Sequence, residues 1–84
     1  MDNYSEQILI KLQNIFRLIF DDNELHINYK SNAEDIDEWD SLNQIKIILE
    51  CEKEFAVTLN PRIINNFLNV GEMVEYLKAN NAKI

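Results

Sequence analysis

The residues best suited to take part in a chemical reaction lie together in the stretch DEWDSLNQ, residues 37–44. One serine, Ser41, lies between Asp40 and Leu42, and three acidic residues precede it within that stretch. A serine hydroxyl can act as a nucleophile, can receive a transferred group, or can cap a helix through its oxygen. The rest of the sequence discriminates among these three roles.

A hydrolytic role for Ser41 finds little support. Such a serine needs a tight turn that presents it and a base that is itself oriented by a third group. The chain has no G-x-S-x-G motif, and its single histidine, His26, has no evident residue to orient it. We therefore predict that Ser41 is not the nucleophile of a serine hydrolase.

The chain also has few residues that could bind a metal or form a disulfide. One histidine and one cysteine are few ligands for a transition metal, and we expect no metal site. Cys51 stands alone, which excludes an internal disulfide and fits a reducing compartment. The start MDNYSEQ is unlike a secretory signal, and no apolar run reaches membrane-spanning length. We predict a cytoplasmic protein without membrane insertion.

The charge balance indicates the kind of partner. The net charge is −7, and residues 21–54 hold 11 acids and 3 bases, a local net charge of −8. Binding to nucleic acid needs clustered Lys and Arg, so we expect no nucleic-acid partner. An acidic middle region is either a solvated surface or a surface that attracts basic patches on proteins.

Helical periodicity predicts the elements that position these residues. Apolar residues recur at spacings of three and four over residues 4–20, 41–56 and 70–79. A shorter helix over 61–67 is expected to begin with Pro61 as its first residue and Asn60 as its N-cap. We predict one domain, residues 1–84, that is all-α: a small four-helix bundle with three main helices plus a short third helix. A long loop, residues 21–40, joins the first two helices, with four apolar anchors: Leu25, Ile27, Ile36 and Trp39. The tail after residue 79 is expected to fray.

The start of the helix over 41–56 is clearly marked. Asp40 or Ser41 can serve as its N-cap, and Ser41 and Gln44 have the spacing of a capping box. The sequence leaves the choice between the two caps open. Asn69 and Glu72 have the same spacing at the start of the last helix.

The helix over 41–56 has two apolar faces. At 100° per residue, one face gathers Ile47, Ile48, Cys51 and Phe55, and a second, roughly 130° away, gathers Leu42, Ile45 and Leu49. The first face is the better candidate for the core, and Cys51 on it is expected to be an inert core thiol. The second face is either covered by the long loop or exposed as a docking strip with acids at its rim.

In these features the chain resembles the acyl carrier protein family. The resemblance extends over nearly the whole chain and is carried by D-S-L at 40–42, apolar Ile45 and Ile47, E-x-E-F at 52–55, V-x-L at 57–59 and V-x-x-M-V-x-Y-L at 70–77. It implies that Ser41 carries 4′-phosphopantetheine. The thiol of that arm would hold an acyl or aminoacyl group as a thioester and present it to partner enzymes. The resemblance thus implies a carrier that is not itself an enzyme.

The resemblance also implies partners and a docking surface. The expected partners are a phosphopantetheinyl transferase, an acyl-loading ligase or transferase, and a downstream synthase, all meeting a monomeric carrier. The candidate docking residues are Asp40, Leu42, Ile45, Lys46, Leu49, Glu50 and Glu52.

Three positions depart from the family. Lys46 stands where an acid is frequent, Trp39 where a small residue is common, and Arg62 in a short helix that is frequently acidic. Within fatty acid or secondary metabolite biosynthesis, these departures favour a dedicated carrier of a specialised pathway. The alternative is an acidic helical protein-interaction module of the same fold that is never modified.

Overall fold

The computed structural model describes residues 2–32, 34–36, 39–59 and 69–84. This part of the chain contains three α-helices, α1 (Asn3–Phe20), α2 (Ser41–Phe55) and α4 (Val70–Ala79), and no strand. None of these helices is long and apolar enough to cross a membrane. The all-α prediction is confirmed, with bounds within one residue of those expected. The short helix expected over 61–67, with Asn60 and Arg62, lies outside the described residues.

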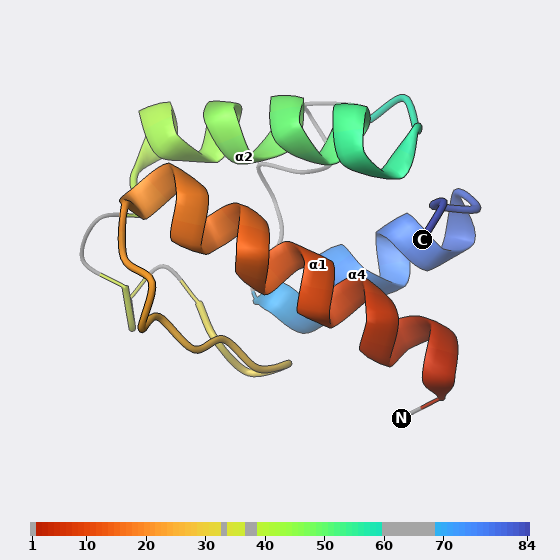
Figure 1. Cartoon of the computed structure of the whole chain (residues 1–84), viewed down its shortest axis with the longest axis horizontal. Helices are drawn as coiled ribbons and strands as arrows, with labels where there is room; N and C mark the ends of the chain where they lie inside the picture. The colour runs from red at the N-terminus through yellow and green to blue at the C-terminus, as the bar shows by residue number, and fades with distance from the viewer. Residues whose placement is uncertain (1, 33, 37–38, 60–68) are drawn as a thin grey trace.

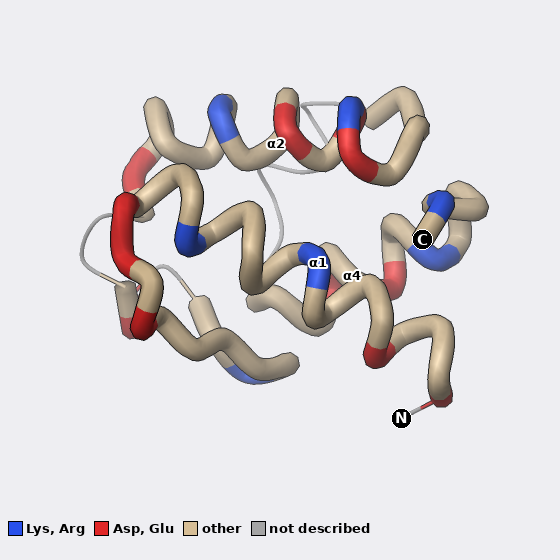
Figure 2. The backbone as a smooth tube through the Cα atoms, viewed as in Figure 1, with Lys and Arg blue, Asp and Glu red and all other residues tan. Residues whose placement is uncertain are grey.

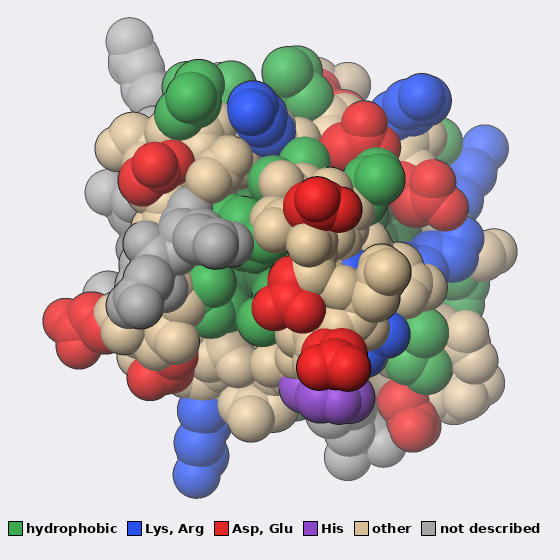
Figure 3. Space-filling view, turned by 60° about the vertical axis from the view of Figure 1, so that its left-hand side comes forward, with side chains coloured by type: hydrophobic (Ala, Val, Ile, Leu, Met, Phe, Trp, Pro, Cys, Tyr) green, Lys and Arg blue, Asp and Glu red, His purple; other side chains and the backbone are tan. Residues whose placement is uncertain are grey.

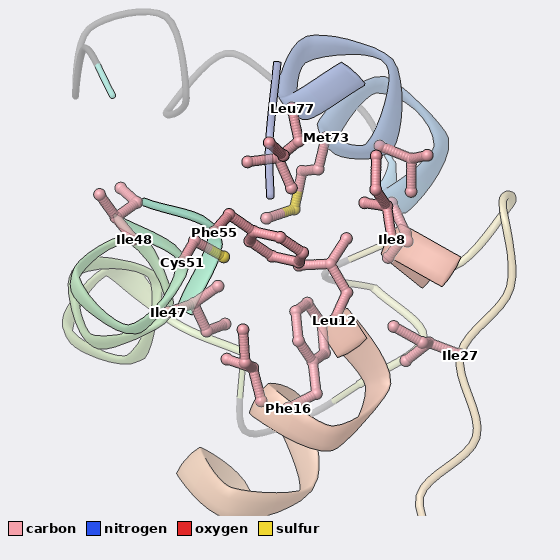
Figure 4. Packing of buried hydrophobic residues seen from close by; sticks show 14 of the residues in the cluster. Ile8, Leu12, Phe16, Ile27, Ile47, Ile48, Cys51, Phe55, Met73 and Leu77 are labelled. Atoms are coloured by element: carbon pink, nitrogen blue, oxygen red, sulfur yellow. The ribbon is translucent and has the colours of Figure 1, made fainter. Parts of the chain in front are cut away.

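Helix α1 is the central element of the fold. It packs against both α2 and α4, running beside α2 in the opposite direction and crossing in front of α4 (Figure 1). Leu12 and Phe16 of α1 point into a core that Phe55 of α2 and Met73 of α4 also enter (Figure 4). Full burial of each large side chain of this kind stabilises the fold by about 1.5–3 kcal/mol.

The helix ends follow local rules of capping. Asp2 caps α1 by accepting a hydrogen bond from the Ser5 amide at 2.7 Å, and Asn69 caps α4 by accepting from the Glu72 amide at 3.0 Å. Helix α2 ends at Phe55, and the C-cap residue Ala56 has a left-handed φ of 52° that turns the chain away from the helix axis. These ends set the lengths of the helices that hold the core.

The loop between α1 and α2 is held against two helices. The Ile27 amide donates to Gln13 Oε1 of α1 at 2.9 Å. The carbonyls of Tyr29 and Ser31 accept from the amides of Gly71 and Val70 at 2.9 and 2.8 Å. These two amides belong to the first turn of α4, which has no helical acceptor for them. The apolar anchors predicted in the loop all pack against the core: Leu25, Ile27, Ile36 and Trp39.

The C-terminal tail is held in place, contrary to the prediction that it would fray. Ala82 is buried, its carbonyl accepts from the Tyr4 hydroxyl at 2.5 Å, and the Lys83 amide donates to the Phe55 carbonyl at 2.9 Å. The tail therefore joins the start of α1 to the end of α2. The prediction was wrong because these partners are distant in sequence.

Candidate functional site

Ser41 is the first residue of α2, and its side chain is exposed. The N-cap is Asp40, with an extended backbone at φ −110° and ψ −175°. Asp40 Oδ1 accepts from the Asn43 amide at 2.8 Å, and the Asp40 carbonyl accepts from the Gln44 amide at 2.9 Å. The question left open by the sequence is settled in favour of Asp40, and the Ser41–Gln44 capping box is not formed. Ser41 makes no side-chain hydrogen bond within the described part of the chain.

The electrostatics at this helix end suit an attached anion. The first amides of a helix lack helical acceptors, and the helix dipole places partial positive charge there. The first turn of α2 after the cap contains no acidic residue. The Asp40 carboxylate accepts from the Asn43 amide, and the amides of Ser41 and Leu42, also in the first turn, have no helical acceptor.

Trp39 ties the start of α2 to the core. Its ring meets Phe16 edge-on, with ring centroids 5.0 Å apart and an interplanar angle of 78°, and Phe16 is fully buried. Its indole Nε1 donates a hydrogen bond to Gln44 Oε1. The expectation that Trp39 anchors the loop is confirmed.

Sequence reasoning considered Gln44 only as a capping-box residue and missed its hydrogen bond with Trp39. A signal existed, because Gln44 precedes Cys51 by two helical turns and so lies on the side of α2 that faces the core. A half-buried polar side chain at such a position needs a hydrogen-bond partner. The sequence could not say that the partner would be Trp39.

The two apolar faces of α2 differ in burial. Ile47, Ile48, Cys51 and Phe55 are buried, as predicted for the core face. The second face is at the surface, with exposed fractions of 62% for Leu42, 53% for Ile45 and 60% for Leu49. Figure 3 shows hydrophobic side chains at the top of the molecule, where α2 lies, with charged side chains among them. We call Leu42, Ile45 and Leu49 the apolar strip.

The charged docking candidates differ in exposure. Asp40 and Lys46 are exposed, whereas Glu50 and Glu52 are half-buried. Glu52 Oε2 also accepts from the Leu59 amide at 3.3 Å, so this carboxylate helps to hold the chain after α2. Both basic and acidic residues lie along α2 (Figure 2). The surface beside the strip is therefore of mixed charge and not uniformly acidic.

His26 and Cys51 have separate surroundings. His26 is exposed, with Nδ1 3.4 Å from Arg17 Nη2. Burial, with the nearby carboxylates of Glu50 and Glu52 adding to it, raises the pKa of the Cys51 thiol to about 12. Across the described ranges, no three His, Cys, Asp or Glu side chains converge as they would around a metal ion.

Comparison with known proteins agrees with this arrangement. Residues 11–77 match a family model described as a phosphopantetheine attachment site. The fold resembles the solution structure of a holo acyl carrier protein from Geobacter metallireducens, at 29% sequence identity and a TM-score of 0.78, covering 86% of this chain and 83% of that one. No curated protein matches the chain.

Proposed function

The chain belongs to the family of carrier proteins that bear a covalent 4′-phosphopantetheine and are not enzymes, and we propose that Ser41 is the residue that carries the group. One observation supports this assignment above the others. Asp40 performs the capping, so the Ser41 hydroxyl stands exposed at the helix end. The D-S-L serine is also the attachment residue of the family that the sequence resembles.

The attachment reaction requires little of the carrier beyond a reachable oxygen. Ser41 Oγ forms a bond to the phosphorus that bears the pantetheine in coenzyme A, the bond from that phosphorus to adenosine 3′,5′-bisphosphate breaks, and the hydroxyl proton passes to a base on the transferase. Asp40, beside Ser41, is suited to contact the transferase's divalent metal. Once bound, the group supplies a terminal thiol that holds cargo as a thioester.

We further propose that partner enzymes dock on the apolar strip. Each partner would dock on the whole strip, Leu42, Ile45 and Leu49. The partners would come one after another: a phosphopantetheinyl transferase, a loading ligase or transferase, and a downstream synthase. Asp40, Lys46, Glu50 and Glu52 would supply the polar rim. Rim charges act mainly on encounter rate and selectivity, which suits a carrier that must leave each enzyme. Lys46 and Trp39 favour partners from a specialised pathway.

Three predictions about the whole chain remain proposals. We propose that residues 1–84 act as a single domain, as a monomer, and in the cytoplasm. The lone, buried Cys51 supports the last of these, because it forms no disulfide.

The test of Ser41 is mass spectrometry of the intact protein after incubation with coenzyme A, Mg²⁺ and a purified phosphopantetheinyl transferase of broad specificity. The wild type should gain the mass of one phosphopantetheinyl group, and Ser41→Ala should gain none. Thr58→Ala is the matched control, because Thr58 offers an exposed hydroxyl beyond the other end of α2. It should be modified like the wild type.

Two results would contradict the proposal. One is an undiminished gain in Ser41→Ala. The other is no gain in the wild type under conditions in which the same transferase modifies a reference acyl carrier protein. A partner complex that forms equally well with Ser41→Ala, from a protein that is never modified, would support the interaction module instead.

A further inference from the structure

A side-chain hydrogen bond spans the residue proposed for modification. Trp39, just before the cap, donates through Nε1 to Oε1 of Gln44, at the end of the first turn of α2. Asp40 and Ser41 lie between these two residues in the chain. We call residues 39–44 the attachment turn and the bond from Trp39 to Gln44 the clasp.

The Trp39 end of the clasp is fixed from outside the turn. The indole packs edge-on against Phe16 at 5.0 Å between ring centroids, and Phe16 has no exposed surface. The Trp39 amide also donates to the Ile36 carbonyl at 3.0 Å. A ring held by a buried partner and by its own backbone has little freedom to rotate.

The Gln44 end is fixed by the helix. The Gln44 amide makes the first helical bond, to the Asp40 carbonyl at 2.9 Å, while the Gln44 side chain accepts from Trp39. The Asp40 side chain closes the turn again by accepting from the Asn43 amide at 2.8 Å. Ser41 therefore lies inside three closures, made by the clasp, the Gln44 amide and the Asn43 amide, although its own side chain is exposed.

We infer that the clasp positions Ser41 for modification, an inference that rests on the proposed attachment at this residue. It joins the attachment turn to the core so that the hydroxyl meets the transferase in one orientation. An acceptor that is held in place need not be oriented within the complex before each transfer, because reaction requires the two atoms within a narrow geometry. Trp39 and Gln44 are positioning residues, since they act through the backbone of the turn.

Three variants separate the hydrogen bond from the packing around it. Trp39→Phe keeps an aromatic ring against Phe16 and removes the donor. Gln44→Met keeps the side-chain length and removes the acceptor, whereas Gln44→Glu keeps an acceptor oxygen. Each variant is assayed for transfer from coenzyme A by a purified transferase, with kcat and the carrier KM measured separately below the onset of unfolding.

The expected result is a selective loss of kcat. Trp39→Phe and Gln44→Met should each lower kcat by about three- to tenfold, the range that one net hydrogen bond spans, with the carrier KM unchanged because the apolar strip is intact. Gln44→Glu should stay within about twofold of wild type by the same scale. The double variant should be no slower than either single one, because both remove the same bond. The emission of Trp39, the chain's single tryptophan, should shift in Gln44→Met and not in Gln44→Glu.

Val74→Ala serves as the stability control. It removes buried methyl groups from α4, outside the attachment turn, and should lower the melting temperature while leaving kcat unchanged. An equal fall in kcat for Val74→Ala and Gln44→Met would assign the effect to general stability and overturn the inference. Wild-type kcat in both Trp39→Phe and Gln44→Met would also overturn it, while modification at Ser41 still stood. Modification of Ser41→Ala would instead remove the proposed function.

Discussion

Asp40 and Ser41 are adjacent at the start of α2, but the structure gives them different tasks. The Asp40 carboxylate caps the helix at 2.8 Å from the Asn43 amide. A serine in that role would have its oxygen bound to an amide of the first turn. Because the aspartate takes the cap, the serine hydroxyl remains exposed for an enzyme to reach.

Cys51 shows how a carrier can keep its own thiol out of thioester chemistry. Burial raises its pKa to about 12, so the thiol is protonated at neutral pH. Only the thiolate is an effective nucleophile. Exchange of cargo from the pantetheine thiol to Cys51 is therefore disfavoured both by access and by protonation.

Lys46 is the residue at which partner selectivity can be tested. Lys46→Glu should raise kcat/KM for a fatty acid synthesis ketosynthase acting on the loaded carrier by about two- to fivefold, because an exposed ion pair contributes roughly 0.2–1 kcal/mol. The gain should shrink at high salt. Lys30→Glu is the control, since it makes the same charge change at an exposed loop residue. Unchanged or lower turnover with Lys46→Glu would count against a selective role for Lys46.

At the scale of elements, the contact between the long loop and α4 depends on Gly71. A Cβ at position 71 would lie 2.8 Å from the Tyr29 carbonyl oxygen and 2.8 Å from Tyr29 Cδ1. The Gly71 amide meanwhile donates to that same carbonyl at 2.9 Å. The absence of a side chain therefore lets the backbone of the loop approach the first turn of α4.

Gly71→Ala should lower the free energy of unfolding. Alanine favours a helix over glycine by at most about 1 kcal/mol, whereas overpacking against a fixed backbone atom costs about 1–3 kcal/mol. Each net kcal/mol should appear as a fall of about 4–8 °C in the melting temperature measured by circular dichroism. Glu75→Ala, at an exposed position of the same helix, should change it little. A Gly71→Ala variant that is more stable than the wild type would contradict this prediction, because the loop would then have moved to accept the methyl group without loss of stability.

At the scale of the whole molecule, the two ends of the chain are joined beside α1. Asp2 caps α1 and also pairs with Lys78 of α4, while Tyr4 of α1 donates to the carbonyl of Ala82. The N-terminal and C-terminal segments are thus held together at the end of α1 away from the loop. The hydrogen bond from Lys78, and then that from the Ser5 amide, lowers the pKa of Asp2 below its ordinary value of 3.8, and the same pair raises the pKa of Lys78.

This pairing predicts part of the acid sensitivity. A carboxyl group whose pKa is lower in the folded state stabilises the fold above its unfolded pKa, and the contribution is lost as the pH falls below about 4. Asp2→Asn keeps a capping oxygen but has no charge to lose. Its melting temperature should therefore fall less than that of the wild type between pH 5 and pH 2. Because the pair is exposed, the difference should be small and should shrink with salt. Equal acid slopes would contradict a stabilising pair.

The sequence by itself determined the helices and the side of α2 that faces the core. Helical periodicity and caps such as Asn69 are properties of a few neighbouring residues, and they predicted the bounds of α1, α2 and α4 to within one residue. The proposal of Ser41 as the attachment residue came from the D-S-L tripeptide through the family that it resembles, and it remains a prediction. These features need no knowledge of which segments meet in space.

Only the tertiary structure decided how these elements cover one another. Asp40 rather than Ser41 as the cap, exposure of the apolar strip, the clasp from Trp39 to Gln44 and the burial of Ala82 were all left open or misjudged. Coverage of the strip and burial of Ala82 depend on segments distant along the chain, whereas the cap and the clasp join near neighbours whose side-chain orientations the spacing leaves open. A periodic pattern says that a face is apolar, but the partner that covers it, or leaves it bare, is set by packing of the whole chain.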